Sequence, residues 1–354
     1  MRLIHILNHI RNCGNGVTNS VIELACQQAQ SGLSVGIISG GGEYEDLVQS
    51  YGIEHFLLDQ YALKKKPFKL LRTVWRYQQI INEFKPDIVH AQMLMGVRIA
   101  KLFKLGKSYK LVSSLRCTFE QDTAIMGWAD RTIAISHAVA QTARELAIPE
   151  EKIRVVLNGP LGGVRRPPIE NYQPVALEKP SITTICGMYE RKGIQDLIVA
   201  FEQIATEIPE VHLYIVGEGP DRLKFEQQAR QTLHKNRIHF EGFQPEPQRY
   251  LLASDIFCLA SHQEPFGRVI AEAREAGCAI VATNIDGIPE ALDWGKAGIL
   301  VPPRNTVSLA TELKKLLHNQ SILDDWSEAA KQNIEWMNVK RVHEETLAVY
   351  KELV

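Results

Sequence analysis

The chain has 354 residues, of which 45% are apolar and 23% are charged, and its formal net charge is −1. This length suggests two domains, and no apolar run approaches the roughly 18 residues that a membrane span requires. The six cysteines are scattered and form no CxxC pair, which disfavours a zinc site or a redox motif. The N-terminus is interrupted by His5, Asn8 and His9, so it lacks the apolar core of a signal peptide. We therefore expect a cytoplasmic protein.

Short apolar runs alternate with amphipathic stretches through the first half of the chain. A strand is followed by a glycine-bearing loop, NCGNG, and by a helix from about Val17 to Gln30. Another helix is predicted over residues 137–147, HAVAQTARELA. Strands that alternate with helices indicate a parallel sheet covered by helices on both faces. The predicted strands are residues 2–7, 33–40, 86–92, 110–116, 131–136 and 153–159.

The alternation stops between Pro160 and Pro180, a segment with five prolines and two glycines that reads as a linker. A second series then begins. Two α/β domains are therefore expected, one over residues 1–165 and the other over residues 180–337, joined by linker 160–180. The second set of predicted strands is 181–187, 211–219, 237–243, 255–261, 278–284 and 297–303.

The C-terminal stretch from about Val307 is predicted to be helical. In its last segment, about 338–354, Val342, Val349, Tyr350 and Leu353 fall on one helical face. We expect this helix to cross back and cover the first domain. Two doubly wound domains would place the open carboxyl ends of their strands toward a shared central cleft, where ligands bind.

The stretch EPFGRVIAEAREAGCAIVATNIDGIPEAL, from Glu264, combines acids, glycines and prolines around two apolar runs. A helix from about Phe266 would offer free first-turn N–H groups to a phosphate. Gly267 would allow a ligand to approach closely. Glu264 could accept hydrogen bonds from hydroxyls, and Glu272 could bind a vicinal diol; residues eight apart on one helix lie roughly 12 Å apart. Alternatively, these are an ordinary helix-terminal acid and an exposed glutamate.

A second loop, in CGMYERKGIQDLIVAF, places Arg191 and Lys192 at the turn after a predicted strand. Basic groups there suit a diphosphate leaving group, because they would neutralise its developing charge. The alternative is an ordinary charged turn.

Taken together, these motifs resemble those of retaining glycosyltransferases of family 4, which have the two-domain GT-B fold. RKG, IVGEGP and VLNG match further landmarks of that family, and the resemblance is dense from Cys186 to Pro303. The main signature is EPFG, a second glutamate, GIPE and GILVPP, at Glu264–Gly267, Glu272, Gly287–Glu290 and Gly298–Pro303.

The resemblance implies roles for individual residues. Glu264, Arg191 and Lys192 would be the catalytic residues. Donor-side contacts would come from Arg191 and Lys192 to the diphosphate, from Glu272 to the ribose, and from Glu264 and the backbone around Phe266 and Gly267 to the sugar. Two glycines, Gly187 and Gly16, complete the predicted donor site. For the loop that contains Gly16, the alternative is a bare strand-to-helix turn without a ligand.

The chain departs from the family pattern at two places. It reads Gly187-Met188-Tyr189 where members often have Gly-Arg-Leu, and Arg116 stands where many have a histidine. Arg116 and His90 are candidates for the acceptor side, although a lone histidine after a buried strand also suits a structural role. There is no Asp-x-Asp motif, so we expect metal-independent transfer without a cofactor.

The expected reaction moves a sugar from a nucleotide sugar, a UDP-sugar before a GDP- or ADP-sugar, to a glycan or lipid-linked acceptor. The resemblance implies attack on the same face, in which the departing diphosphate helps to deprotonate the acceptor. A sugar-nucleotide epimerase and a non-catalytic sugar-nucleotide-binding protein are the alternatives. A dinucleotide-dependent dehydrogenase is disfavoured, because GNGVTN and GEGPDR both lack the third glycine of its fingerprint.

Charge is unevenly distributed along the chain. Residues 61–110 hold twelve Lys and Arg against two acids. Lys64, Lys65 and Lys66 precede Pro67 and Phe68, a mixture that suits an anionic membrane surface. No nucleic-acid motif is present, so the alternatives are peripheral attachment to the inner face of a membrane and a solvated basic face.

Overall fold

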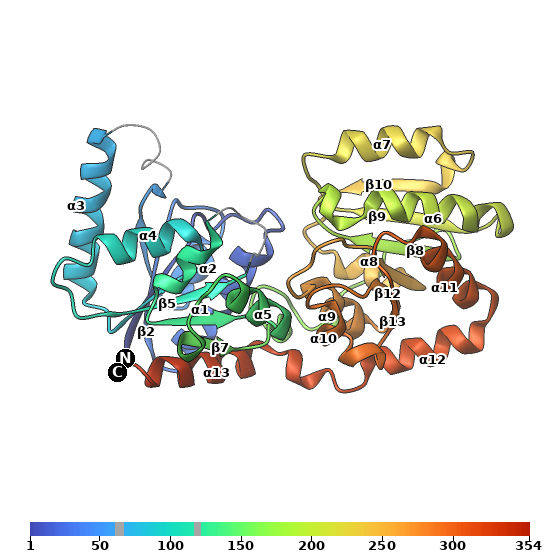
Figure 1. Ribbon diagram of the computed structural model, residues 1–354. Coiled ribbons are helices and arrows are strands. Elements are labelled where there is room, and N and C mark those ends of the chain that lie inside the picture. The colour runs from blue at the N-terminus through green and yellow to red at the C-terminus, as the bar shows by residue number, and fades with distance from the viewer. Residues whose placement is uncertain (61–66, 117–121) are drawn as a thin grey trace. The chain divides into compact units, whose positions relative to one another are not determined.

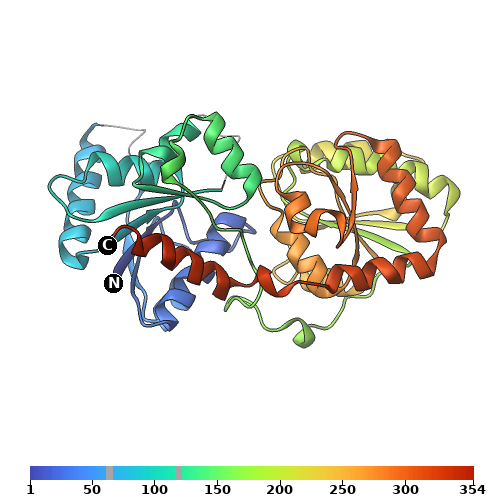
Figure 2. The same cartoon turned by 60° about the horizontal axis from the view of Figure 1, so that its bottom comes forward.

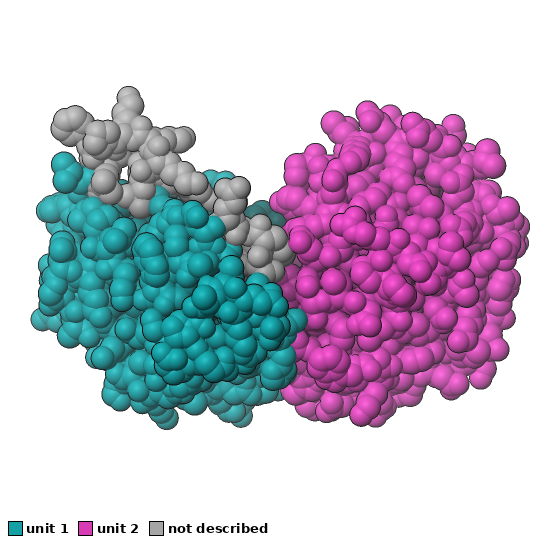
Figure 3. Space-filling model, viewed as in Figure 1, with its two compact units in different colours: residues 1–166, 338–354 teal, residues 167–337 magenta. Residues whose placement is uncertain are grey.

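A computed structural model describes residues 1–60, 67–116 and 122–354. The chain forms two compact units (Figure 3), one comprising Met1–Arg166 together with Asn338–Val354 and the other Pro167–Met337. The boundary falls inside the proline-rich segment, which holds one short 3-10 turn, Ile169–Asn171. Lys64, Lys65 and Lys66, which belong to the basic stretch 61–110, lie outside the described residues.

The first unit is built on one seven-stranded sheet in which every pairing is parallel. The strand order is β3-β2-β1-β4-β5-β6-β7, so the direction of winding reverses between β1 and β4. Sequence patterning missed β3, a short edge strand with only one buried residue. The strands are β1 Arg2–Ile6, β2 Ser34–Ser39, β3 Glu54–Leu57, β4 Ile88–Ala91, β5 Lys110–Leu115, β6 Arg131–Ala134 and β7 Ile153–Val155.

Helices lie on both faces of this sheet (Figures 1 and 2). On one face, Leu3, Ile88 and Val112 of the strands share a core with α1 and α13. On the other face, Phe84 of α3 reaches β2, where a side chain at Gly36 would meet its ring. The helices are α1 Gly16–Gln30, α2 Glu45–Ser50, α3 Pro67–Phe84, α4 Leu94–Leu102, α5 His137–Glu145 and α13 Val339–Lys351.

The last helix, α13, belongs to the first unit and packs along α1. Val342, Val349 and Tyr350 are buried, and the partly buried Leu353 packs against the same core. At the C-terminal end, the Glu352 carboxylate accepts hydrogen bonds from Arg131 and Arg154 at 2.8 Å. The apolar stripe predicted from the sequence is therefore the face that α13 buries.

The second unit contains a six-stranded parallel sheet in the order β10-β9-β8-β11-β12-β13. Its winding reverses between β8 and β11. The strands are β8 Ser181–Ile185, β9 His212–Val216, β10 Ile238–Gly242, β11 Ile256–Leu259, β12 Ala279–Thr283 and β13 Ile299–Val301. The predicted class, α/β with two doubly wound Rossmann-like sheets, is confirmed.

Two helices, α6 and α11, pack together on one face of this sheet and share a core with Ile182, Leu213 and Val281. Within the stretch predicted to be helical from about Val307, α12 ends at Lys331, and the next α-helix, α13, begins only at Val339. The helices are α6 Ile194–Glu207, α7 Arg222–Gln231, α8 Gln248–Ala253, α9 Arg268–Ala276, α10 Ile288–Ala291, α11 Thr306–His318 and α12 Gln320–Lys331.

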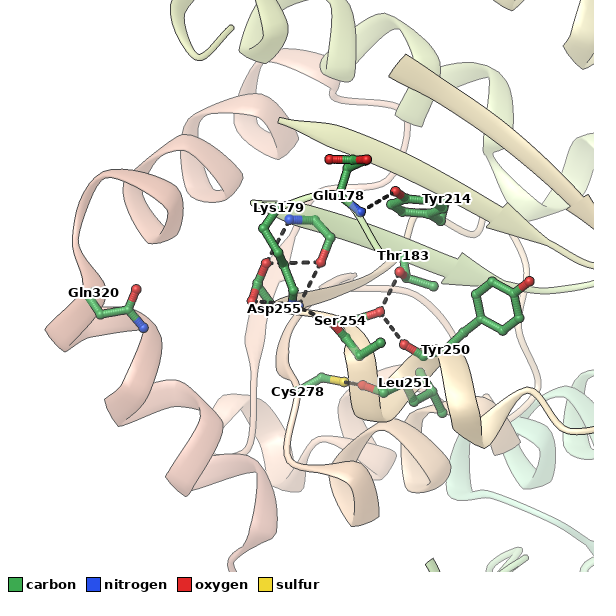
Figure 4. A network of polar contacts seen from close by, with 12 residues as sticks. Glu178, Lys179, Thr183, Tyr214, Tyr250, Leu251, Ser254, Asp255, Cys278 and Gln320 are labelled. Carbon is green, nitrogen blue, oxygen red and sulfur yellow. Dashed lines mark hydrogen bonds and ion pairs between the residues drawn. The ribbon is translucent and has the colours of Figure 1, made fainter. Parts of the chain in front are cut away.

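Polar contacts fasten the amino ends of the central strands of this unit (Figure 4). The Asp255 carboxylate, just before β11, accepts from the Ser181 backbone N–H at 2.7 Å and from the Lys179 ammonium at 2.6 Å. The Ser254 hydroxyl donates to the Thr183 hydroxyl of β8. The loops that follow β8 and β11 lie at the opposite, carboxyl edge of the sheet. Within the described residues, none of the helices combines the length and the apolarity that crossing a membrane requires.

Candidate functional site

The candidate site lies at the carboxyl edge of the second sheet, where the winding direction reverses. In open α/β sheets, ligands bind at this position, because the loops from the two central strands diverge there. The loop after β8 carries Gly187, Arg191 and Lys192, and the loop after the neighbouring β11 carries Glu264, Phe266 and Gly267. The fold therefore brings together two motifs that are about seventy residues apart in sequence.

The loop after β8 forms a tight turn that ends at Gly193. A 3-10 turn spans Glu190–Lys192, and Gly193, at φ 67°, is the N-cap of α6. The Arg191 guanidinium lies 5.3 Å from the centre of the Tyr189 ring. A side chain at Gly187 would meet the same ring, since an added Cβ would lie 2.9 Å from it. The stacking keeps Arg191 beside the strand end.

Close backbone contacts join this turn to the loop after β11. The backbone N–H of His262 donates to the Arg191 carbonyl at 2.7 Å. An added Cβ at Gly193 would lie 1.8 Å from the Ala260 carbonyl oxygen, so only glycine allows this approach. The His262 ring contacts the Asp196 carboxylate of α6 at 2.6 Å. These contacts thus hold the two loops together.

Lys192 and Glu264 form an ion pair at the centre of the site. Their side chains are 13% and 12% exposed, so the pair is largely shielded from water but still reachable. The Glu264 backbone N–H donates to the Asp286 carboxylate at 2.8 Å, and its carbonyl accepts from Gly287 at 3.1 Å. Glu264 is therefore held by the loop after β12, as well as by Lys192.

Gly267 caps α9, which begins at Arg268 and not at about Phe266 as predicted. Gly267 has a φ of 81°, a backbone conformation that L side chains rarely adopt. The Phe266 ring is buried and packs edge-to-face on Trp336, with centroids 6.1 Å apart. Phe266 can thus offer its backbone to a ligand, while its side chain anchors the loop.

Glu272 lies in the second turn of α9 and is half-buried. Because α9 starts after Glu264, the two acids do not share one helix, and the eight-residue helical spacing does not apply to them. The pair consists of one loop carboxylate and one helical carboxylate. This separation leaves Glu264 beside the cation of Lys192, with Glu272 on the adjoining helix.

A cysteine, Cys186, stands directly after β8 at the edge of this site. Burial raises the pKa of Cys186, directly after β8, to about 11, although the nearby Lys192 ammonium acts in the opposite direction. The thiol therefore remains protonated at neutral pH. Among the described residues, His, Cys, Asp and Glu side chains form no group of three or more that could hold a metal ion.

In the first unit, Gly16 is the first residue of α1. The preceding Asn15 caps this helix, because its side chain accepts from the backbone N–H groups of Val17 and Thr18. Gly14, at φ 71°, makes the turn into the cap. The loop thus forms a well-capped helix start. Contact of Gly16 with the donor stays a prediction.

The two acceptor-side candidates have different environments. His90 is fully buried, and its ring nitrogens contact the Tyr350 hydroxyl at 2.6 Å and the Ser114 hydroxyl at 2.8 Å. His90 has no exposed surface, which favours the structural role over direct contact with an acceptor. Arg116 is half-buried, follows β5, and donates from Nε to Gln92 at 3.0 Å.

Sequence reasoning missed Asp286 and the His262–Asp196 contact, both of which support the site. Asp286 has a φ of 45° and accepts from the Glu264 backbone. The sequence feature that could have identified Asp286 is the NIDGIP turn, in which an acidic residue precedes a glycine and a proline at a strand end. The histidine and Asp196 are 66 residues apart, so no local pattern connects them.

Two protein-family models match the chain. The model described as Glycosyltransferase Family 4 matches residues 14–159, and the model described as Glycosyl transferases group 1 matches residues 169–333. Among curated proteins, N-acetyl-alpha-D-glucosaminyl L-malate synthase of Bacillus anthracis is 25% identical, over 91% of this chain and 89% of that protein. The lipopolysaccharide core biosynthesis glycosyltransferase LpsD of Rhizobium meliloti is also 25% identical, over 78% of this chain and 74% of its own.

Solved structures match the whole chain at low sequence identity. Anabaena HepE in complex with UDP and glucose gives a TM-score of 0.84 at 18% identity, covering 99% of both chains. Sucrose-phosphate synthase from Thermosynechococcus elongatus gives 0.83 at 17% identity, covering 100% of this chain and 99% of that one. These likenesses establish the fold.

Proposed function

Because this chain is a glycosyltransferase that belongs to family 4, we propose that it transfers a sugar from a nucleoside diphosphate sugar to an acceptor, with retention of configuration. A UDP-sugar is the preferred donor. This choice draws support from HepE, whose crystals hold UDP and glucose. The acceptor is a glycan or a lipid-linked glycan of the cell envelope, in keeping with the lipopolysaccharide core enzyme among its relatives.

The observation that carries this proposal is the shielded ion pair between Lys192 and Glu264. The largely shielded Lys192 ammonium at this strand end offers a bound diphosphate one fixed positive charge, and the Glu264 carboxylate beside it offers a bound sugar one acceptor for its hydroxyls. Arg191, held against the Tyr189 ring, adds a second cation on the same turn. Glu272 on α9 is assigned to the ribose.

The proposed chemistry depends on stabilising the leaving diphosphate. As the bond from the sugar to the diphosphate breaks, negative charge develops on the phosphate oxygens, and the ammonium of Lys192 and the guanidinium of Arg191 neutralise it. The diphosphate then accepts the proton of the attacking acceptor hydroxyl on the same face. These cations supply the stabilisation that a metal ion gives in other enzymes, so we propose metal-independent transfer, with activity that persists in EDTA.

A donor screen tests the proposal. UDP-, GDP- and ADP-sugars are compared by thermal shift, and each that binds is incubated with and without acceptor. A shift with a UDP-sugar that is lost in Lys192→Met, with turnover that depends on acceptor, is the expected result. Appearance of a new nucleotide sugar without acceptor would identify an epimerase, and binding without any turnover would identify a binding protein.

We also propose that the first unit attaches to an anionic membrane surface through α3. Leu71 and Trp75, one helical turn apart, are 68% and 61% exposed. Arg72 and Arg76 follow each of them directly. Such a mixture of apolar and cationic side chains suits the interface of a membrane, where each cation contributes about 1 kcal/mol.

Co-sedimentation with vesicles of phosphatidylcholine and phosphatidylglycerol tests this attachment. Binding is expected to weaken in high salt and to be lost in a variant with Leu71→Ser and Trp75→Ser. The double substitution Lys314→Glu and Lys315→Glu on α11, in the other unit, serves as the control. If binding changes neither with salt nor with the two substitutions in α3, then α3 is an ordinary solvated helix.

A further inference from the structure

Buried polar atoms without a hydrogen-bond partner gather near one edge of the second sheet. Among the described residues of the second unit, they occur on three side chains, those of Gln195, Gln248 and Ser261. Gln195 lies in the first turn of α6, Gln248 is the first residue of α8, and Ser261 follows β11. Each position comes after the carboxyl end of a strand. All three residues therefore lie toward the edge of the sheet that holds the candidate site.

Gln248 is the extreme case of the three, because both atoms of its amide are buried and lack a partner. The residue is 2% exposed. Gln195, by contrast, still donates from Nε2 to the Glu190 carbonyl at 2.9 Å. Burial of an amide without hydrogen bonds is unfavourable, and most buried amides in folded proteins have partners. A side chain that is kept in spite of this cost is a candidate for binding a ligand.

The helix that begins with Gln248 packs against α9. Gln248 and Leu251 are three residues apart and therefore share one face of α8, and Leu251 is 1% exposed. The Leu251 carbonyl accepts from the thiol of Cys278, which follows the C-cap of α9, at 3.1 Å (Figure 4). Glu272, the residue assigned to the ribose, lies on α9. Gln248 thus belongs to the helix beside the one that carries the ribose ligand.

The direction of the two helices places Gln248 at the end nearer to the candidate site. In a parallel sheet, each connecting helix runs from the carboxyl edge back to the amino edge. The helix α8 leads from β10 to β11, and α9 leads from β11 to β12. Because Gln248 starts α8, it lies at the end of that helix closest to the carboxyl edge.

The chemistry of the amide restricts which part of a nucleotide sugar can satisfy it. An amide offers a donor, Nε2, beside an acceptor, Oε1. Phosphate oxygens only accept, so a diphosphate would leave Oε1 of Gln248 without a partner. The hydroxyls of the sugar and of the ribose are assigned to Glu264 and Glu272. A uracil ring presents an N3–H donor beside the O4 acceptor, which matches both atoms of the amide.

We propose that Gln248 binds the base of the donor nucleotide, a uracil, through both atoms of its amide. Oε1 accepts from N3–H, and Nε2 donates to O4. The inference rests on the proposed function, which supplies the UDP-sugar and the position of its ribose. The diphosphate and the base are attached to opposite ends of the ribose, so a base beyond Glu272 reaches the neighbouring helix. In the ligand-free protein the amide is enclosed, and rotation about its side-chain bonds turns it toward the base.

A purely structural role for Gln248, in which an internal water satisfies the amide, is the competing explanation. It predicts that loss of the amide lowers stability and leaves the response to the base unchanged. Reading of the base by backbone groups alone is a second alternative. The two measurements below separate these explanations from a direct contact between Gln248 and uracil.

Calorimetric titration of the full-length protein with UDP and with 3-methyluridine 5′-diphosphate tests the contact at one atom. The methyl group replaces the N3 proton and leaves the ribose and the diphosphate unchanged. The wild-type protein should bind the methylated compound about tenfold more weakly than UDP. Gln248→Met, which keeps the length of the side chain, should bind UDP about tenfold more weakly and should not distinguish the two compounds. Reading by backbone groups would make the methyl group equally harmful in both proteins.

Thermal denaturation without ligand gives the second measurement. Gln248→Met removes two buried atoms that lack partners, so the melting temperature should rise by about 2 °C. The matched control is Gln28→Met in the first unit. Gln28 is also fully buried, but its amide contacts His5 at 2.7 Å and Tyr350 at 3.5 Å. Its replacement should therefore lower the melting temperature.

Three outcomes would overturn the assignment of Gln248. They are an unchanged UDP affinity in Gln248→Met, an equal effect of the N3 methyl group in both proteins, and a melting temperature that falls as it does in Gln28→Met. If the wild-type protein still binds UDP and turns over a UDP-sugar, the proposed function stands in each of these cases. A wild-type protein that binds no UDP would count against the proposed donor and the contact together.

Discussion

Replacement of Gly193 by alanine probes the contact that holds the two site loops together. The added Cβ would lie 1.8 Å from the Ala260 carbonyl oxygen, which is part of the backbone and cannot turn away. The residue also has a φ of 67°, where any L side chain is strained. The turn that carries Lys192 must therefore move away from the loop after β11.

The magnitude follows from two separate costs. The left-handed backbone conformation costs an alanine about 1–2 kcal/mol, and forcing atoms into a packed contact costs about 1–3 kcal/mol more. Gly193→Ala should thus lower the free energy of unfolding by about 2–5 kcal/mol. Gly52→Ala is the matched control, because Gly52 has a φ of 71° and an added Cβ there meets nothing within 4 Å. Gly52→Ala should lower the free energy of unfolding only by the cost of the left-handed backbone conformation.

Urea denaturation of both variants measures the difference, and calorimetric titration with UDP reports on the site. We expect Gly193→Ala to bind UDP at least tenfold more weakly, because the Arg191 carbonyl would lose its 2.7 Å contact with the His262 N–H. Gly52→Ala should bind normally. Equal stability losses in the two variants, or unchanged UDP binding in Gly193→Ala, would refute the claim that this close approach assembles the site.

Three further predictions concern single side chains. Lys192→Met should cost about 2–4 kcal/mol of transition-state stabilisation, on the order of a hundredfold in turnover of UDP-glucose; wild-type turnover would remove Lys192 from the site. Glu264→Gln should lower kcat more than UDP affinity, and Glu272→Gln should do the opposite; the reverse pattern in kinetics and titration would exchange their roles. The contribution of His5 to the unfolding free energy should fall by up to about 3 kcal/mol as the pH drops from 6.5 to about 4, because the unfolded chain takes up a proton at His5 that the folded protein, with a His5 pKa of about 4, does not. Denaturation across this pH range should show a shallower slope in His5→Gln than in the control His137→Gln, which changes an exposed histidine; equal slopes would contradict the assignment.

The sequence by itself determined the class of fold and the identity of the main motifs. Alternating apolar runs and amphipathic stretches specify strands and helices locally, and the strands are placed within a few residues of their predicted bounds. The apolar face of α13 was visible in the spacing of Val342, Val349 and Tyr350. The short β3 escaped notice because an edge strand with a single buried residue leaves almost no pattern.

Only the tertiary structure decided which of these residues meet. Lys192 and Glu264 pair across 72 positions, and Gly193 faces Ala260, because β8 and β11 are neighbours in the sheet although helices and two other strands separate them in the chain. His90 was ambiguous from sequence, since its neighbours come from β5 and from α13, 260 residues away. Local patterns record which way a residue faces along its own element, whereas its partners depend on strand order and on where α13 packs, and both are properties of the whole fold.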